Sequence, residues 1–119
     1  MKVSAAGTIN LRNDNPQNIV FKEEKRNDAV ILKELGNKFF SEKQFVQAIK
    51  CYQDAMQKTS EDDLKMILFS NTSQNYLELQ MYEDALENAE EALKFQKDHR
   101  KSLLRKASAL AFLYEFEQS

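Results

Sequence analysis

The stretch LKELGNKFFSEKQFVQAIKCYQDA, residues 32–55, is the most informative part of the chain for the fold. In its first half, Leu32, Leu35 and Phe39 follow helical spacing, so they line one stripe of a helix. Its second half predicts another helix, which carries Phe45, Ala48, Ile49, Tyr52, Ala55 and Met56. Gly36 interrupts the first stripe at a cost of about 1 kcal/mol to the helix, so we expect it to serve close packing.

The pattern of this stretch recurs along the chain. Three apolar positions match at an offset of 37 residues: Phe45 with Tyr82, Ala48 with Ala85, and Ala55 with Ala92. A third unit follows at an offset of 34, pairing Asn71 with Arg105 and Tyr76 with Leu110. Fixed-period similarity is typical of stacked helical hairpins, each of which buries one face against the next. We therefore predict an all-α fold with these residues largely buried: Phe39, Ala48, Tyr52, Ala55, Tyr76, Ala85 and Leu110.

Composition supports helices and excludes several classes of function. Two Gly and one Pro in 119 residues are too few for a small all-β domain or a Gly-rich phosphate loop. A net charge of −2 gives no strong field toward nucleic acid or a membrane surface. A single Cys51 and a single His99 exclude an internal disulfide and a Cys/His zinc site. We therefore expect no cofactor, metal, nucleic acid or membrane, and a reducing, cytoplasmic location.

The chain divides into a polar arm and a helical domain. Residues 1–20 show no apolar periodicity, and we assign residues 21–119 to the domain. Within the domain we place repeats at about 29–62, 66–99 and 100–119. The last repeat lacks most of its second helix, so we expect the chain to belong to a longer protein.

These units resemble the tetratricopeptide repeat, whose pattern is W-x₂-L-G-x₂-Y followed by A-x₃-F. The first unit reads Leu32-x₂-Leu35-Gly36-x₂-Phe39, then Ala48-x₃-Tyr52. The second reads Phe69-x₂-Thr72-Ser73-x₂-Tyr76, and the third reads Leu103-x₂-Lys106-Ala107-x₂-Leu110. The resemblance implies antiparallel hairpins stacked as a short solenoid of about two and a half repeats.

Five polar residues are distributed over the first helices of the three units. In such a stack, the first helix of each unit lines the concave side. Lys33 and Asn37 are four residues apart and share one face, as do Lys101 and Arg105, and Asn71 lies on the helix between. Three cations and two amides suit a ligand with two carboxylates, because all five side chains donate hydrogen bonds.

This set resembles the dicarboxylate clamp of co-chaperone tetratricopeptide domains, with K-x-x-G-N, then N, then K-x-x-x-R. The resemblance implies binding of the acidic C-terminal tail, ending in Glu-Glu-Val-Asp, of heat shock protein 90 or heat shock protein 70. It implies that Lys33, Asn37 and Asn71 hold the terminal α-carboxylate and that Lys101 holds the terminal Asp side chain. It also implies that Arg105 assists by contacting residues further upstream in the tail.

Phe40 and Leu104 are candidates for apolar contacts with the tail. Gln74 and Glu78 depart from the family pattern and bear on which chaperone is preferred.

Two other functions are alternatives to this interpretation. A general tetratricopeptide scaffold for a non-chaperone partner would have the same fold without the clamp. An enzyme would need a nucleophile–base pair, a metal cluster or a phosphate loop, and the sequence offers none of these. We therefore predict a protein-interaction adaptor and not an enzyme.

Overall fold

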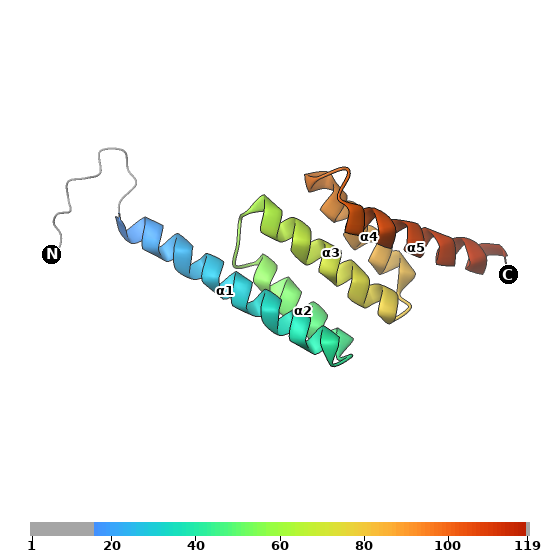
Figure 1. Ribbon diagram of the computed structural model, residues 1–119, viewed down its shortest axis with the longest axis horizontal. Coiled ribbons are helices and arrows are strands. Elements are labelled where there is room, and N and C mark those ends of the chain that lie inside the picture. The colour runs from blue at the N-terminus through green and yellow to red at the C-terminus, as the bar shows by residue number, and fades with distance from the viewer. Residues whose placement is uncertain (1–15, 119) are drawn as a thin grey trace.

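The computed structural model describes residues 16–118 and consists there of helices joined by short turns (Figure 1). The helices are α1 (Pro16–Ser41), α2 (Phe45–Met56), α3 (Asp62–Glu78), α4 (Tyr82–Phe95) and α5 (Arg100–Gln118). The predicted all-α class is confirmed. Most of the polar arm expected at residues 1–20 lies outside the described residues, and α1 begins at Pro16, a residue suited to a first helical turn.

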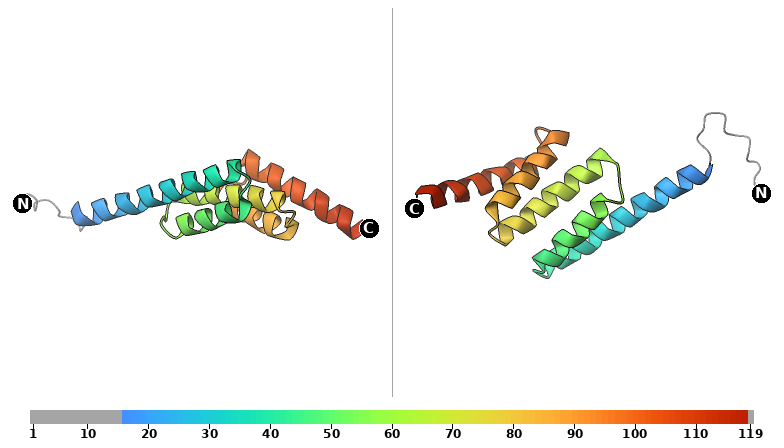
Figure 2. Two further views of the ribbon diagram at one scale, coloured as in Figure 1. Left: turned by 90° about the horizontal axis from the view of Figure 1, so that it is seen from below. Right: turned by 180° about the vertical axis from the view of Figure 1, so that it is seen from behind.

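The helices pair as antiparallel hairpins that stack side by side. Helix α1 packs on α2, α3 packs on α4, and α5 packs against both α4 and α3. Seen from below, α1 and α5 lie toward one side of the stack, and α2 and α4 lie toward the other (Figure 2). Because α3 contacts α2 and α5 as well as α4, it connects the two ends of the stack.

The turns within both hairpins have the same backbone conformation. Lys43 and Gln80 adopt positive φ angles of 62° and 60°. In each turn the next N–H reaches back five residues, from Gln44 to the Phe39 carbonyl at 2.8 Å and from Met81 to the Tyr76 carbonyl at 2.9 Å. This is the Schellman arrangement, which usually places glycine at the left-handed position. Here the repeat offset of 37 extends to the turns, although neither carries a glycine.

Small residues allow the helices to approach closely. Seven alanines are fully buried: Ala29, Ala48, Ala55, Ala85, Ala89, Ala92 and Ala109. Between α3 and α4, Ser73 donates a hydrogen bond from Oγ to the Ala85 carbonyl at 2.7 Å. Between α1 and α2, Gly36 lies against the Tyr52 ring, which confirms the expected packing role of that glycine.

Most of the predicted core is confirmed, with one error. Tyr52 and the predicted alanines are buried, and Phe39 and Tyr76 are half-buried. Leu110 is 46% exposed, so the prediction that it is buried was wrong. Helix α5 packs through Ala109, and successive helical residues point about 100° apart. Leu110 therefore faces away from α4, and within residues 16–118 no further helix covers it.

None of the helices in the described part of the chain has both the length and the apolar character needed to cross a bilayer.

Candidate functional site

The five predicted polar residues come together around one open hollow of about 370 Å³. We call it the main hollow; its lining is Lys33, Asn37, Phe40, Tyr52, Ile67, Asn71, Gln74, Asn75, Lys101 and Arg105. Four helices contribute, namely α1, α2, α3 and α5. Of the seven predicted site residues, only Leu104 lies outside this lining.

Helical spacing explains how the polar side chains reach one surface. Lys33, Asn37 and Phe40 lie one turn apart along α1, and Lys101 and Arg105 do the same on α5. Across the helices, the Asn71 amide Nδ2 lies 3.3 Å from Asn37 Oδ1, so the first two units meet at the asparagine pair.

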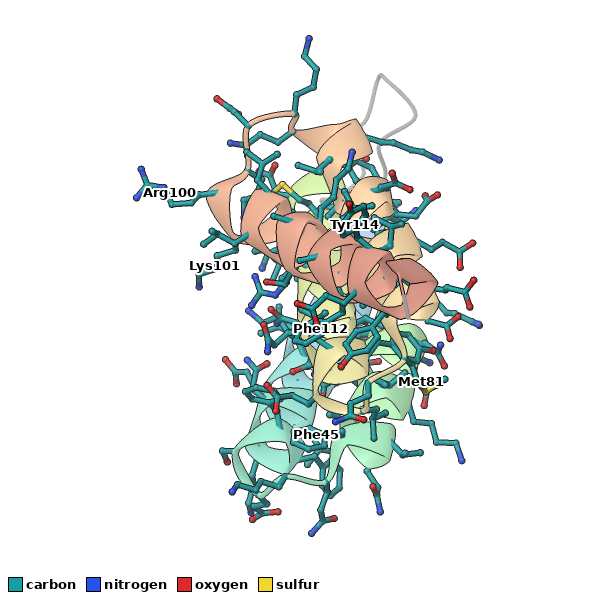
Figure 3. The ribbon with its side chains drawn as sticks, turned by 90° about the vertical axis from the view of Figure 1, so that its right-hand side faces the viewer. Phe45, Met81, Arg100, Lys101, Phe112 and Tyr114 are labelled. Carbon is teal, nitrogen blue, oxygen red and sulfur yellow. The ribbon has the colours of Figure 1, made fainter. Side chains whose placement is uncertain are left out.

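The main hollow is strongly cationic. Its lining contains three cations and no carboxylate. Among the described residues, Lys33 and Lys101 take part in no ion pair, whereas Lys106 pairs with Glu90 and Lys94 pairs with Glu91. Lys33 is half-buried and Lys101 is exposed. Lys101 extends with Arg100 from the start of α5, on one side of the molecule (Figure 3). These charges are available to an anionic ligand.

Arg105 lies deeper in the main hollow than the two lysines. Its Nη1 donates to Ser70 Oγ at 3.2 Å, and its Nε is buried with no partner among the described residues. Burial lowers the pKa of Arg105, and the nearby Tyr52 opposes that shift. Arginine stays protonated near neutral pH even so, because its ordinary pKa is far higher. The guanidinium therefore carries a positive charge at the floor of the hollow.

A hydrogen-bonded floor supports the asparagine pair. The Tyr52 hydroxyl donates to Asn37 Oδ1 at 2.6 Å, and Asn75 Nδ2 donates to the Asn71 carbonyl at 2.9 Å. Burial raises the pKa of Tyr52 to about 12, and the nearby Asn75 side chain partly offsets the rise. The Tyr52 hydroxyl is therefore protonated at neutral pH and remains a donor.

Leu104 belongs to a second hollow of about 200 Å³ beside the first, which we call the side hollow. Its lining is Gln74, Leu77, Lys101, Leu104, Arg105 and Ser108, of which three residues are shared with the main hollow. Leu104 is 62% exposed there. Gln74 donates from Nε2 to Glu78 Oε2 at 2.9 Å. The two residues that depart from the family pattern are therefore hydrogen-bonded to each other.

Sequence reasoning missed the floor of the main hollow. Tyr52 was predicted only as a core residue, and Asn75 and Ile67 were not predicted as site residues. The one available signal was Gly36 beside Asn37, since a missing side chain there leaves room for an aromatic ring from the next helix.

The chain shares sequence with several curated proteins. It is 34% identical to protein unc-45 homolog B of Xenopus tropicalis over 92 residues, which are 77% of this chain and 10% of that protein. It is 37% identical to the Hsp70-Hsp90 organising protein of Plasmodium falciparum over 84 residues, 71% of this chain and 32% of that protein. The chain thus spans between a tenth and a third of these relatives. No protein-family model matches the sequence.

Solved structures share its fold. The second tetratricopeptide domain of Spaghetti (RPAP3), bound to the HSP90 peptide SRMEEVD, has a TM-score of 0.73 and 27% identity, covering 85% of this chain and 84% of that one. The second such domain of human RPAP3, in complex with the HSP70 peptide SGPTIEEVD, has a TM-score of 0.69 and 26% identity, covering 79% and 76%. With the hairpin stack and the repeated small residues, these similarities identify the chain as a tetratricopeptide repeat domain. It is similar to domains that have been solved with acidic tails of heat shock proteins.

Proposed function

We propose that this domain is a co-chaperone-like adaptor that binds acidic tails of the Glu-Glu-Val-Asp type, from heat shock protein 90, heat shock protein 70 or both. The observation that carries the proposal is the main hollow, where three cations converge with the pair Asn37 and Asn71 and the lining contains no carboxylate. The similarity to domains solved with SRMEEVD and SGPTIEEVD supports it. Binding an extended peptide in a preformed groove requires no catalytic group.

Each lining residue has a proposed role. Lys33, Asn37 and Asn71 hold the terminal α-carboxylate, and Lys101 at the rim holds the terminal Asp side chain. Arg105, on the floor, interacts with residues further upstream. Hydrogen bonds to charged groups contribute about 1.5–3 kcal/mol each, so a few of them suffice for specific binding of a short tail. Phe40 in the main hollow and Leu104 in the side hollow provide apolar contacts.

We assign this activity to residues 21–119, with repeats at about 29–62, 66–99 and 100–119. We also propose a cytoplasmic location, because the single Cys51 is buried and unpaired, as suits a reducing compartment.

Titration calorimetry with the two tail peptides tests the proposal. We expect wild type to bind SRMEEVD or SGPTIEEVD, and Lys101→Ala to bind about tenfold or more weakly, because a carboxylate loses its charged partner. Lys106→Ala is the matched control: it removes a lysine from the same helix, but one that pairs with Glu90 outside the main hollow. Failure of wild type to bind either peptide would favour the general scaffold for a non-chaperone partner.

A further inference from the structure

The hydroxyl of Tyr52 on α2 is hydrogen-bonded to the side-chain oxygen of Asn37 on α1. Asn37 Oδ1 accepts from Tyr52 Oη at 2.6 Å and from Asn71 Nδ2 at 3.3 Å. An amide oxygen has two lone pairs, so both acceptor positions are filled. Asn37 Nδ2 has no hydrogen-bond partner among the described residues, and Asn37 is exposed. The amide thus leaves its N–H donors for a ligand in the main hollow.

The position of that hydroxyl is itself fixed by packing. The Tyr52 side chain is 1% exposed and belongs to the core formed with Ala29, Ala48 and Leu68. Its ring lies against Gly36, the residue before Asn37, where no side chain separates α1 from α2. The ring therefore cannot turn toward solvent, and the hydroxyl stays within reach of Asn37.

We propose that Tyr52 is a positioning residue of the tail-binding site: its hydroxyl holds Asn37 with Nδ2 toward the ligand carboxylate. The orientation matters because an amide oxygen turned toward an anion would repel it, whereas the amide N–H attracts it. Tyr52 acts through Asn37, and the inference rests on the proposed function of the main hollow.

A double-mutant cycle with the free-acid peptide SRMEEVD tests this role. We expect Tyr52→Phe to bind roughly fivefold to tenfold more weakly than wild type, since it keeps the ring and loses only the hydroxyl. In an Asn37→Ala background, Tyr52→Phe should lower the affinity by less than about twofold, because the Asn37 amide through which Tyr52 acts is absent. Tyr76→Phe is the control: Tyr76 is half-buried and outside the lining of the main hollow, and we expect wild-type affinity.

The outcomes separate the two proposals. Tyr52→Phe binding as well as wild type, or losing as much affinity without Asn37 as with it, would overturn the positioning role while leaving the tail-binding site intact. If wild type binds neither tail peptide, the proposed function fails. NMR relaxation of the free protein then tests whether Tyr52 positions the Asn37 side chain. The positioning role requires a rigid Asn37 side-chain amide in wild type and a mobile one in Tyr52→Phe; equal mobility in both would contradict it.

Discussion

Gly36 on α1 lies directly against the ring of Tyr52 on α2: a Cβ at residue 36 would lie 2.6 Å from Cε1 and 2.9 Å from Cδ1. Carbon atoms in favourable contact are about 3.5–4.0 Å apart, so no side chain fits there unless the ring moves. The same ring carries the hydroxyl that bonds Asn37 at 2.6 Å. The packing of the first hairpin and the geometry of the main hollow therefore depend on one contact.

Gly36→Ala should lower stability. Overpacking costs about 1–3 kcal/mol, which offsets or exceeds the roughly 1 kcal/mol that alanine adds in helix propensity. Urea denaturation of wild type and variant measures the difference. In a Tyr52→Leu background the clash is relieved, so Gly36→Ala should become neutral or stabilising. A clear gain in stability from Gly36→Ala alone would contradict the clash, because it would show that the Tyr52 ring moves aside at little cost.

Ala85→Leu should be destabilising by about 1–3 kcal/mol, because the added atoms have no space between α3 and α4. Ala85 is fully buried, and its carbonyl accepts the hydrogen bond from Ser73. Ala111→Leu makes the same change at an exposed position on α5 and should be nearly neutral. Equal melting temperatures for wild type and Ala85→Leu would argue against the close stacking of these hairpins.

Gln80→Gly should raise stability by about 0.5–1 kcal/mol, since a left-handed backbone strains any residue with a Cβ. Lys43→Gly should do the same in the equivalent turn. Gln57 is the matched control because it ends α2 with an ordinary right-handed φ of −79°. Gln57→Gly should lower stability, as glycine there only adds freedom to the unfolded chain. Chemical denaturation that ranks Gln80→Gly below wild type would contradict the strain.

The raised pKa of Tyr52 predicts a loss of stability at alkaline pH. Between its ordinary pKa of 10.0 and the folded value of about 12, the unfolded chain has lost the Tyr52 proton while the folded chain retains it. Unfolding then releases a proton, so the stabilisation is complete below pH 10 and disappears as pH rises toward 12. Tyr52→Phe cannot release this proton, so unfolding midpoints should fall less steeply with pH for the variant than for wild type. If the unfolding midpoints of wild type and Tyr52→Phe fall in parallel with pH, the pKa of Tyr52 is not raised in the folded protein.

Local spacing explains why most of the fold and of the site could be predicted. Stripes such as Leu32 and Phe39 specify helices, and pairs four residues apart, such as Lys101 and Arg105, specify a shared face. Leu110 was misplaced because its burial depends on a covering helix that the described residues do not provide. The contact between Tyr52 and Asn37 could not be predicted for a similar reason. It joins α2 to α1 across 15 residues, and only the packed hairpin brings these two side chains together.

In the proposed function, the main hollow recognises a free terminal carboxylate. The most direct measurement is calorimetric titration of wild type with SRMEEVD in its free-acid and C-terminally amidated forms. Amidation removes the charge that Lys33, Asn37 and Asn71 are proposed to hold, so we expect the amide to bind about tenfold or more weakly than the free acid. Equal affinity for the two peptides would show that the main hollow does not recognise the terminal carboxylate.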